Sequence, residues 1–271
     1  MTGAFRVTLV AILLVANFVA PVAASPLDDA VTAMRNGDYS VALPLIRSLA
    51  EGGNASAQSD LGSMYYNGKG VTRNYAEAVK WYRLAANQGN ALAQALLGNM
   101  YYDGKGVPQN YAEAVKWVRL AAEQGNAFAQ ATLGAMYVHG EGVQQSDTEA
   151  VKWYRLAAER GIAEAQSNLG VMYIKGTGVL KSYKEGLKWS RLAANQGNSE
   201  AQLVLATLYL LGNGVPQDYV LAHMWCNLSA AQGNQTAVES LEKLAQLLTS
   251  AQIAEAQKFA REWRPSNRSP Q

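Results

Sequence analysis

The strongest constraint on this chain is a sequence repeat with a period of 36 residues. A glycine that opens a Gly-Asn-Ala or closely related tripeptide returns at this step from Gly53 to Gly233. Two aromatic columns keep the same step, one of tyrosine and one of tryptophan (Tyr65, Tyr101, Tyr137, Tyr173, Tyr209; Trp81, Trp117, Trp153, Trp189, Trp225). A fixed period between about 20 and 50 residues predicts a solenoid, in which stacked helical or strand units share one continuous core.

Each period contains two helical patterns separated by a glycine-rich loop. In the first full unit we expect helices over 55–66 and 75–87, because apolar residues recur at helical spacing on one face of each. The loop between them, 68–71, has the pattern Gly-x-Gly-Val, which returns in every full unit, and its first glycine stands where a left-handed residue commonly ends a helix. The loop lacks the Lys-Ser/Thr or strand–helix context of a phosphate site, so we interpret its glycines as structural. The expected fold class is all-α, an α/α superhelical solenoid of 36-residue helix–loop–helix repeats.

Atypical helical segments flank the five full units, which we place at 54–232. Before them, residues 25–53 read as a degenerate unit, with helices over 26–36 and 38–50. Pro44 lies past the first turn of the second helix, where it removes a backbone hydrogen bond.

After the repeats, residues 233–264 read as a C-terminal helical cap, as terminal units of solenoids are atypical where one face meets water. We expect one helix over 236–248 and a second started by a capping box of Thr249 and Gln252. The last residues, 265–271, are expected to be disordered, because Pro265 stops the helix.

The N-terminal residues 1–24 have the pattern of a secretory signal peptide. Arg6 supplies the positive charge, and the apolar run over 7–20 is short for a membrane span. Small residues precede a cleavage site that we place between Ala24 and Ser25. The sequence therefore predicts export, to the periplasm or outside the cell, without stable membrane insertion after cleavage; the alternative is an uncleaved anchor.

Composition and the scarcity of reactive side chains argue against chemistry as the task. The 23 Lys and Arg nearly balance 21 Asp and Glu, so charge gives no reason to expect nucleic acid or an anionic membrane surface as partner. The single cysteine, Cys226, cannot form an intrachain disulfide and reads as a packed residue. His139 and His223 fall in different units, without a nearby cluster of metal-ligand spacing. We expect no cofactor, no metal and no catalytic site.

The repeat resembles a known family. Its motifs are Ala-Gln-x-x-Leu-Gly-x-Met-Tyr, then Gly-x-Gly-Val, then Tyr-x-x-Ala-x-x-Trp and Ala-Ala-x-x-Gly, which match the Sel1-like repeat at Ala57–Gly89 and Ala93–Gly125 and more loosely afterwards. The resemblance implies an α/α superhelix related to tetratricopeptide repeats and a role as a scaffold or adaptor for other proteins. Some secreted members with two cysteines per repeat have an attributed β-lactamase-like activity, and this chain lacks those cysteine pairs.

Positions that vary between units mark a candidate binding face. In the first helix of each unit they are spaced i, i+4, i+7 and i+11, which is one stripe opposite the core. In related solenoids this helix lines the concave side, so the resemblance implies a protein-binding groove. We predict an apolar centre of Leu92, Leu96 and Phe128 with a rim of Asp60, Tyr66, Asn99 and Tyr102. The alternative is that the apolar residues only fill contacts between adjacent units.

Two repeated columns, one of tryptophan and one of arginine, are expected to lie at contacts between helices or units. The tryptophan column, represented by Trp117, should be packed between helices in the middle of the array. A repeated arginine column should follow an outer or inter-unit ridge and pair with carboxylates (Arg83, Arg119, Arg155, Arg191).

The functional hypothesis is a non-enzymatic exported scaffold that binds a protein or peptide in its groove, with regulation of an envelope or signalling partner as one form of that role. The alternative, a cell-wall-directed or β-lactamase-like hydrolase, is implied by the family resemblance alone.

Overall fold

A computed structural model describes residues 26–265, and within this range the chain contains helices and no strands. The predicted signal peptide, its cleavage site and the end of the chain beyond Pro265 lie outside the described residues. The helices are α1 (Pro26–Arg35), α2 (Tyr39–Glu51), α3 (Ala55–Asn67), α4 (Tyr75–Asn87), α5 (Ala91–Asp103), α6 (Tyr111–Glu123), α7 (Ala127–His139), α8 (Asp147–Glu159), α9 (Ala163–Lys175), α10 (Tyr183–Asn195), α11 (Ser199–Leu211), α12 (Tyr219–Ala230), α13 (Gln235–Ala245) and α14 (Ser250–Glu262). The predicted all-α solenoid is confirmed.

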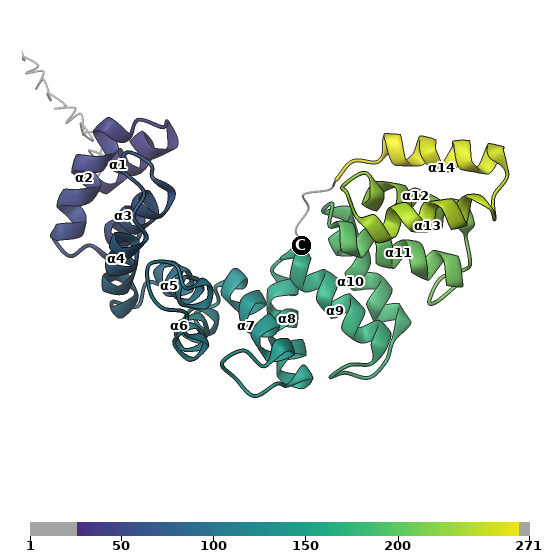
Figure 1. Cartoon of the computed structure of the whole chain (residues 1–271), viewed down its shortest axis with the longest axis horizontal. Coiled ribbons are helices and arrows are strands. Elements are labelled where there is room, and N and C mark those ends of the chain that lie inside the picture. Colours follow the sequence, from purple (N-terminus) through teal and green to yellow (C-terminus); the bar gives the residue numbers. More distant parts are fainter. Residues whose placement is uncertain (1–25, 266–271) are drawn as a thin grey trace, which may run out of the picture.

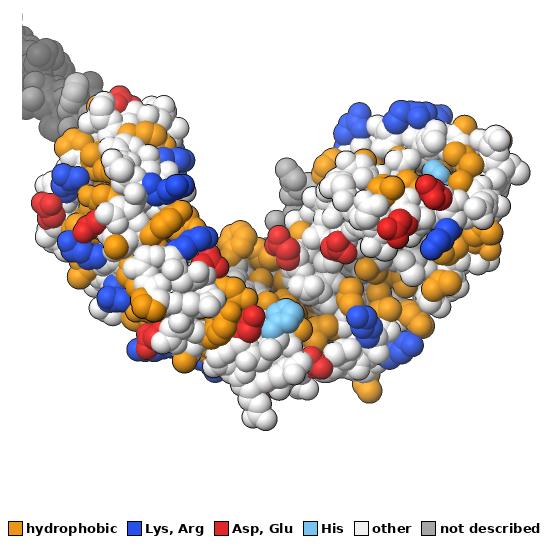
Figure 2. All heavy atoms as spheres, in the orientation of Figure 1, with side chains coloured by type: hydrophobic (Ala, Val, Ile, Leu, Met, Phe, Trp, Pro, Cys, Tyr) orange, Lys and Arg blue, Asp and Glu red, His pale blue; other side chains and the backbone are white. Residues whose placement is uncertain are grey.

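The helices stack in chain order along a curved path (Figure 1). Each helix from α1 to α12 packs against the next, and α14 folds back onto α12. The arc runs from α1 and α2 at one end, through α7 and α8, to α12–α14 at the other, and both ends rise on the same side (Figure 1). A space-filling view shows the hollow that this curvature leaves between the two ends (Figure 2). None of the helices in the described range is long and apolar enough to cross a membrane.

Local capping explains why the helices begin and end where they do. The Asn54 side chain accepts a hydrogen bond from the backbone N–H of Ala57 at 2.9 Å, and Asn90 and Asn126 cap α5 and α7 in the same way. At the other end of α3, Gly68 adopts a left-handed conformation with φ of 69°. The asparagine cap recurs at the start of α11 and is replaced at the start of α9 by Ile162, which has no side-chain cap, whereas the left-handed glycine closes the first helix of all five full units. The period of the sequence thus becomes the period of the backbone.

The C-terminal cap differs slightly from its prediction. Helix α13 ends at Ala245, three residues before the predicted end at Leu248. The N–H groups of Leu247 and Leu248 bond to carbonyls three residues back rather than four, so the last turn tightens and leaves the α-helix. The capping box of Thr249 and Gln252 at the start of α14 is confirmed.

Consecutive repeats are joined by the tryptophan column. Trp117 is 9% exposed and belongs to the core cluster made mostly by α4 and α5, so the side chain from α6 wedges into the preceding repeat. Trp189 does the same with the cluster of α8 and α9. The packing expected of Trp117 is confirmed.

Repeated glycines let the two helices of a unit approach closely. A Cβ at Gly62 would lie 2.6 Å from the Tyr82 ring, and one at Gly98 would lie 3.1 Å from the Ala114 carbonyl oxygen. Any side chain at these positions would push the paired helices apart, which explains why glycine recurs inside a helix despite its cost to helix stability.

Candidate functional site in the variable face of the repeats

Buried glutamines hold the first helix of each unit in a constant position. The Gln94 side chain donates to the Ala86 carbonyl at 3.1 Å and accepts from Gln124 at 2.6 Å. Equivalent bonds recur along the array, with Arg160 in place of glutamine as the donor to Gln130. The pairing fixes one face of α3, α5, α7, α9 and α11 against the core, so the opposite, variable face is presented in the same way in every repeat.

The arginine column lies between units but does not pair with carboxylates. Each guanidinium donates to the hydroxyl of the tyrosine eighteen residues later, as in Arg119–Tyr137 at 3.0 Å and Arg155–Tyr173 at 2.8 Å. The prediction of carboxylate partners is therefore wrong. The nearby glutamates are taken by lysines on their own helices, as in Glu113 with Lys116 at 3.7 Å, because i, i+3 neighbours meet without bridging between helices.

The most exposed members of the predicted groove are apolar. Phe128 is 70% exposed and Leu92 is 53% exposed, and both lie near the start of their helices. Leu96 is half-buried and packs against the α4–α5 core, so for this residue the alternative of filling contacts within the array holds in part.

Three pockets occur at equivalent places along this face. One of about 350 Å³ lies between α1, α2 and α3, one of about 250 Å³ between α3, α4 and α5, and one of about 350 Å³ between α7, α8 and α9. Their lining residues fall in the same columns of the repeat, as Met64, Met100 and Met172 illustrate. Two of these volumes are at the lower end of the range typical of ligand sites, and that of the α3–α5 pocket is slightly below it.

The structure gathers four predicted groove residues in the α3–α5 pocket. Tyr66, Leu96, Asn99 and Tyr102 all line it. Asp60 instead lines the pocket between α1 and α3, where burial raises the pKa of its carboxyl. Leu92 and Phe128 line none of these three pockets and stand on the same face farther toward the helix N-termini.

Polar groups around the α3–α5 pocket satisfy one another. Lys105 donates to Asp103 at 2.7 Å and to the Tyr66 hydroxyl at 3.4 Å. The Tyr102 hydroxyl donates to Glu141 at 2.8 Å, and this bond to a carboxylate raises the pKa of Tyr102 to about 12. The pocket is thus bordered by hydrogen bonds that join adjacent repeats.

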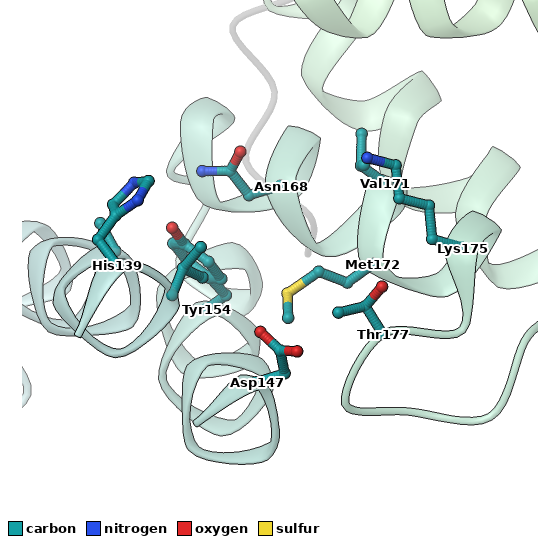
Figure 3. A pocket seen from close by; sticks show the side chains of 10 residues that line it. His139, Asp147, Tyr154, Asn168, Val171, Met172, Lys175 and Thr177 are labelled. Atoms are coloured by element: carbon teal, nitrogen blue, oxygen red, sulfur yellow. The ribbon is translucent and has the colours of Figure 1, made fainter. Parts of the chain in front are cut away.

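The α7–α9 pocket was not predicted as a site (Figure 3). Its apolar wall is Ala135, Val138, Val171 and Met172, and its polar groups are His139, Asp147, Tyr154, Asn168, Lys175 and Thr177. The signal was present in the sequence, because Asn168 and Val171 belong to variable columns and His139 and Lys175 continue the stripe by one further turn. The prediction instead followed large apolar residues, which are scarcer in this part of the stripe.

Tyr154 supplies the buried polar group of this pocket. The residue is 4% exposed, and burial raises the pKa of its phenol to about 12, so the hydroxyl remains a protonated donor at neutral pH. In the close view its hydroxyl points toward the end of the pocket where Asn168 and His139 lie, whereas Asp147 lies across the pocket beside Thr177 (Figure 3).

The remaining candidate reactive residues lie in two parts of the array, His139 in α7 and the pair His223 and Cys226 in α12. His139 is exposed at the end of α7, and His223 is buried in α12, where burial lowers its pKa. Cys226 is buried, its Sγ donates to the Ala237 carbonyl at 3.2 Å, and burial raises the pKa of its thiol to about 11. Within residues 26–265 no three His, Cys, Asp or Glu side chains are grouped so that they could hold a metal ion.

Comparisons with known proteins agree with the repeat motif. A model of the Sel1 repeat matches five consecutive segments, 55–90, 91–126, 127–162, 163–198 and 199–234. The crystal structure of a Sel1 repeat protein from Oxalobacter formigenes is 35% identical with a TM-score of 0.78, and the match covers 91% of this chain and 100% of that chain. No curated protein matches the chain.

A second solved structure is a protective antigen present in uropathogenic Escherichia coli strains and displaying an SLR fold. It is 37% identical with a TM-score of 0.75, and the match covers 86% of this chain. This chain spans only about half of that protein, 52% of its length. The resemblance inferred from the motifs is confirmed, and the chain belongs to the Sel1 repeat family, with the helical scaffold fold of that family.

Proposed function

We propose that this chain is a non-enzymatic exported scaffold that binds a protein or peptide partner along the variable face of its repeats. The observation that carries the proposal is the recurrence of one pocket at equivalent positions of the array. Pockets at equivalent positions of a curved array suit an extended segment that places its side chains in pockets of different repeats.

Exposed apolar side chains on the same face support a protein partner. Phe128 and Leu92 come from adjacent repeats and remain in contact with water. Large exposed apolar side chains flanked by polar groups are the usual anatomy of the centre of a recognition surface.

The test is the substitution Phe128→Glu, measured by capture of partners from the native cell envelope and by thermal melting. Because Phe128 is 70% exposed, we expect an unchanged melting temperature and capture weakened by at least about tenfold. Leu180→Glu is the matched control, because it also replaces an exposed apolar side chain by glutamate. Leu180 is 90% exposed in the α9–α10 loop and lines none of the three pockets.

A large fall in the melting temperature of the Phe128 variant would show that this side chain is part of the core. Equal capture by the wild type and the Phe128 variant would move the site away from the variable face, to the loops around Lys69 and Lys105 or to the C-terminal cap.

Export is the second part of the proposal and rests on the N-terminal sequence pattern. We expect the protein recovered from the periplasmic or secreted fraction to begin at Ser25, which N-terminal sequencing measures directly. Recovery of a chain that retains Met1 and sediments with membranes would contradict export by a cleaved signal.

A further inference from the structure

The α7–α9 pocket differs from the α3–α5 pocket in having charged side chains with no partner in the protein. In the α3–α5 pocket, Asp103 is bound by Lys105 at 2.7 Å. The residue two repeats later is Lys175, and the position of Lys105 is taken by Thr177. Within residues 26–265, no hydrogen bond or ion pair engages the side chains of Lys175, His139 or Asp147. These groups are therefore available to a ligand.

The arrangement favours an acceptor group on the ligand. Lys175 is a donor only, and the Tyr154 phenol, the Asn168 amide and the His139 ring each offer a donor as well. Asp147 is the single carboxylate, and it lies in the first turn of α8, where the helix N-terminus offsets its charge.

The geometry of the pocket keeps such a ligand away from Asp147. Figure 3 shows Asn168, the Tyr154 hydroxyl and His139 toward one side, with the Lys175 side chain reaching upward beside Val171, and Asp147 on the opposite side near Thr177. An acidic side chain seated on the Asn168 side would pack its methylene stem against Val171 and Met172, which line the same pocket.

We propose that the α7–α9 pocket receives an acidic side chain, Glu or Asp, from an extended segment of the partner, an inference that rests on the proposed function. Charge complementarity with the unpaired Lys175 supplies the selectivity for an acidic side chain, because a cation at a site attracts an anionic group and disfavours a cationic one. Phe128 and His139 lie on the same helix, eleven residues or roughly 16 Å apart. A partner segment that contacts both would therefore place an apolar residue at Phe128 and its acidic residue several positions away, in the α7–α9 pocket.

The experiment selects a display library of random short peptides against the mature wild-type protein, against Lys175→Glu and against Lys184→Glu. Lys184 is exposed on α10 and lines none of the three pockets, so it matches the charge change off the site. We expect peptides enriched in Asp and Glu from the wild type and from the Lys184 variant, and peptides enriched in Lys and Arg from the Lys175 variant.

The affinity of a selected peptide for the protein is then measured by fluorescence anisotropy in a charge-swap cycle, in which the charges on the protein and on the peptide are reversed singly and together. We expect Lys175→Glu to weaken binding by at least about tenfold, and replacement of the peptide's acid by lysine to restore it. Melting curves verify that each variant is folded. If the Lys175→Glu variant does not fold, Lys175→Gln takes its place in the binding measurement. Binding with no acidic preference, unchanged by either Lys175 variant, overturns the acidic-residue inference while leaving a peptide-binding scaffold. Enrichment of no peptide at all overturns the inference together with the proposed function.

Discussion

The pockets at α3–α5 and α7–α9 lie at the same position of the repeat, two repeats apart, and differ in what their side chains do. In the first, Lys105 donates to Asp103 of its own repeat and to Tyr66 of the preceding repeat. In the second, the equivalent residues are Val138, Lys175 and Thr177, which make no such bonds. The backbone frame is shared, so the difference shows that variable side chains alone turn one position of the repeat into a closed structural contact and another into an open site.

The largest expected effect comes from breaking the frame that the two pockets share. Trp117→Ala should lower the free energy of unfolding by about 3–5 kcal/mol, because the indole is buried between repeats and its Nε1 donates to Glu113 at 3.2 Å. Chemical denaturation measures the loss, and Leu180→Ala, at a 90% exposed position, is the control with little expected change. Equal stability of the Trp117 variant and the wild type would show that the tryptophan column does not join the repeats.

A smaller effect sharpens the contrast between the two pockets. Tyr102→Phe removes the hydrogen bond to Glu141, which should cost about 1 kcal/mol at pH 8, since both groups are partly exposed. Tyr154→Phe, in the open pocket, removes a hydrogen bond with the neutral Asn168 amide and should cost less, because hydrogen bonds to charged groups are the stronger ones. If the Tyr154 variant were the less stable of the two, the division into a self-satisfied and an open pocket would be wrong.

The Tyr102 comparison also carries a pH dependence. The bond to Glu141 raises the folded-state pKa of Tyr102 to about 12, above an unfolded value of about 10. Its contribution to stability is therefore complete below about pH 10 and is lost as pH rises through about 12. The stability difference between wild type and Tyr102→Phe should shrink across that range, as denaturation at a series of pH values would measure.

Much of the architecture could be predicted because each repeat specifies its own boundaries locally. Asparagine caps and left-handed glycines act within a few residues, so Asn54 and Gly68 start and end α3 whatever lies farther along the chain. The predicted end of α13 is three residues too late because no local capping residue marks it; the helix ends instead in a tightened turn at Leu247 and Leu248.

The sequence by itself determined the period, the helix pairs, the order of stacking and the face that varies, because all of these follow from residues repeated at a constant spacing. Only the tertiary structure decided which positions on that face are open. Tyr102 is engaged by Glu141, a residue 39 positions later, whereas the side chain of Lys175 has no such partner within residues 26–265. The pairing of side chains between repeats depends on the twist and separation of neighbouring helices, and neither quantity can be read from the sequence of a single repeat.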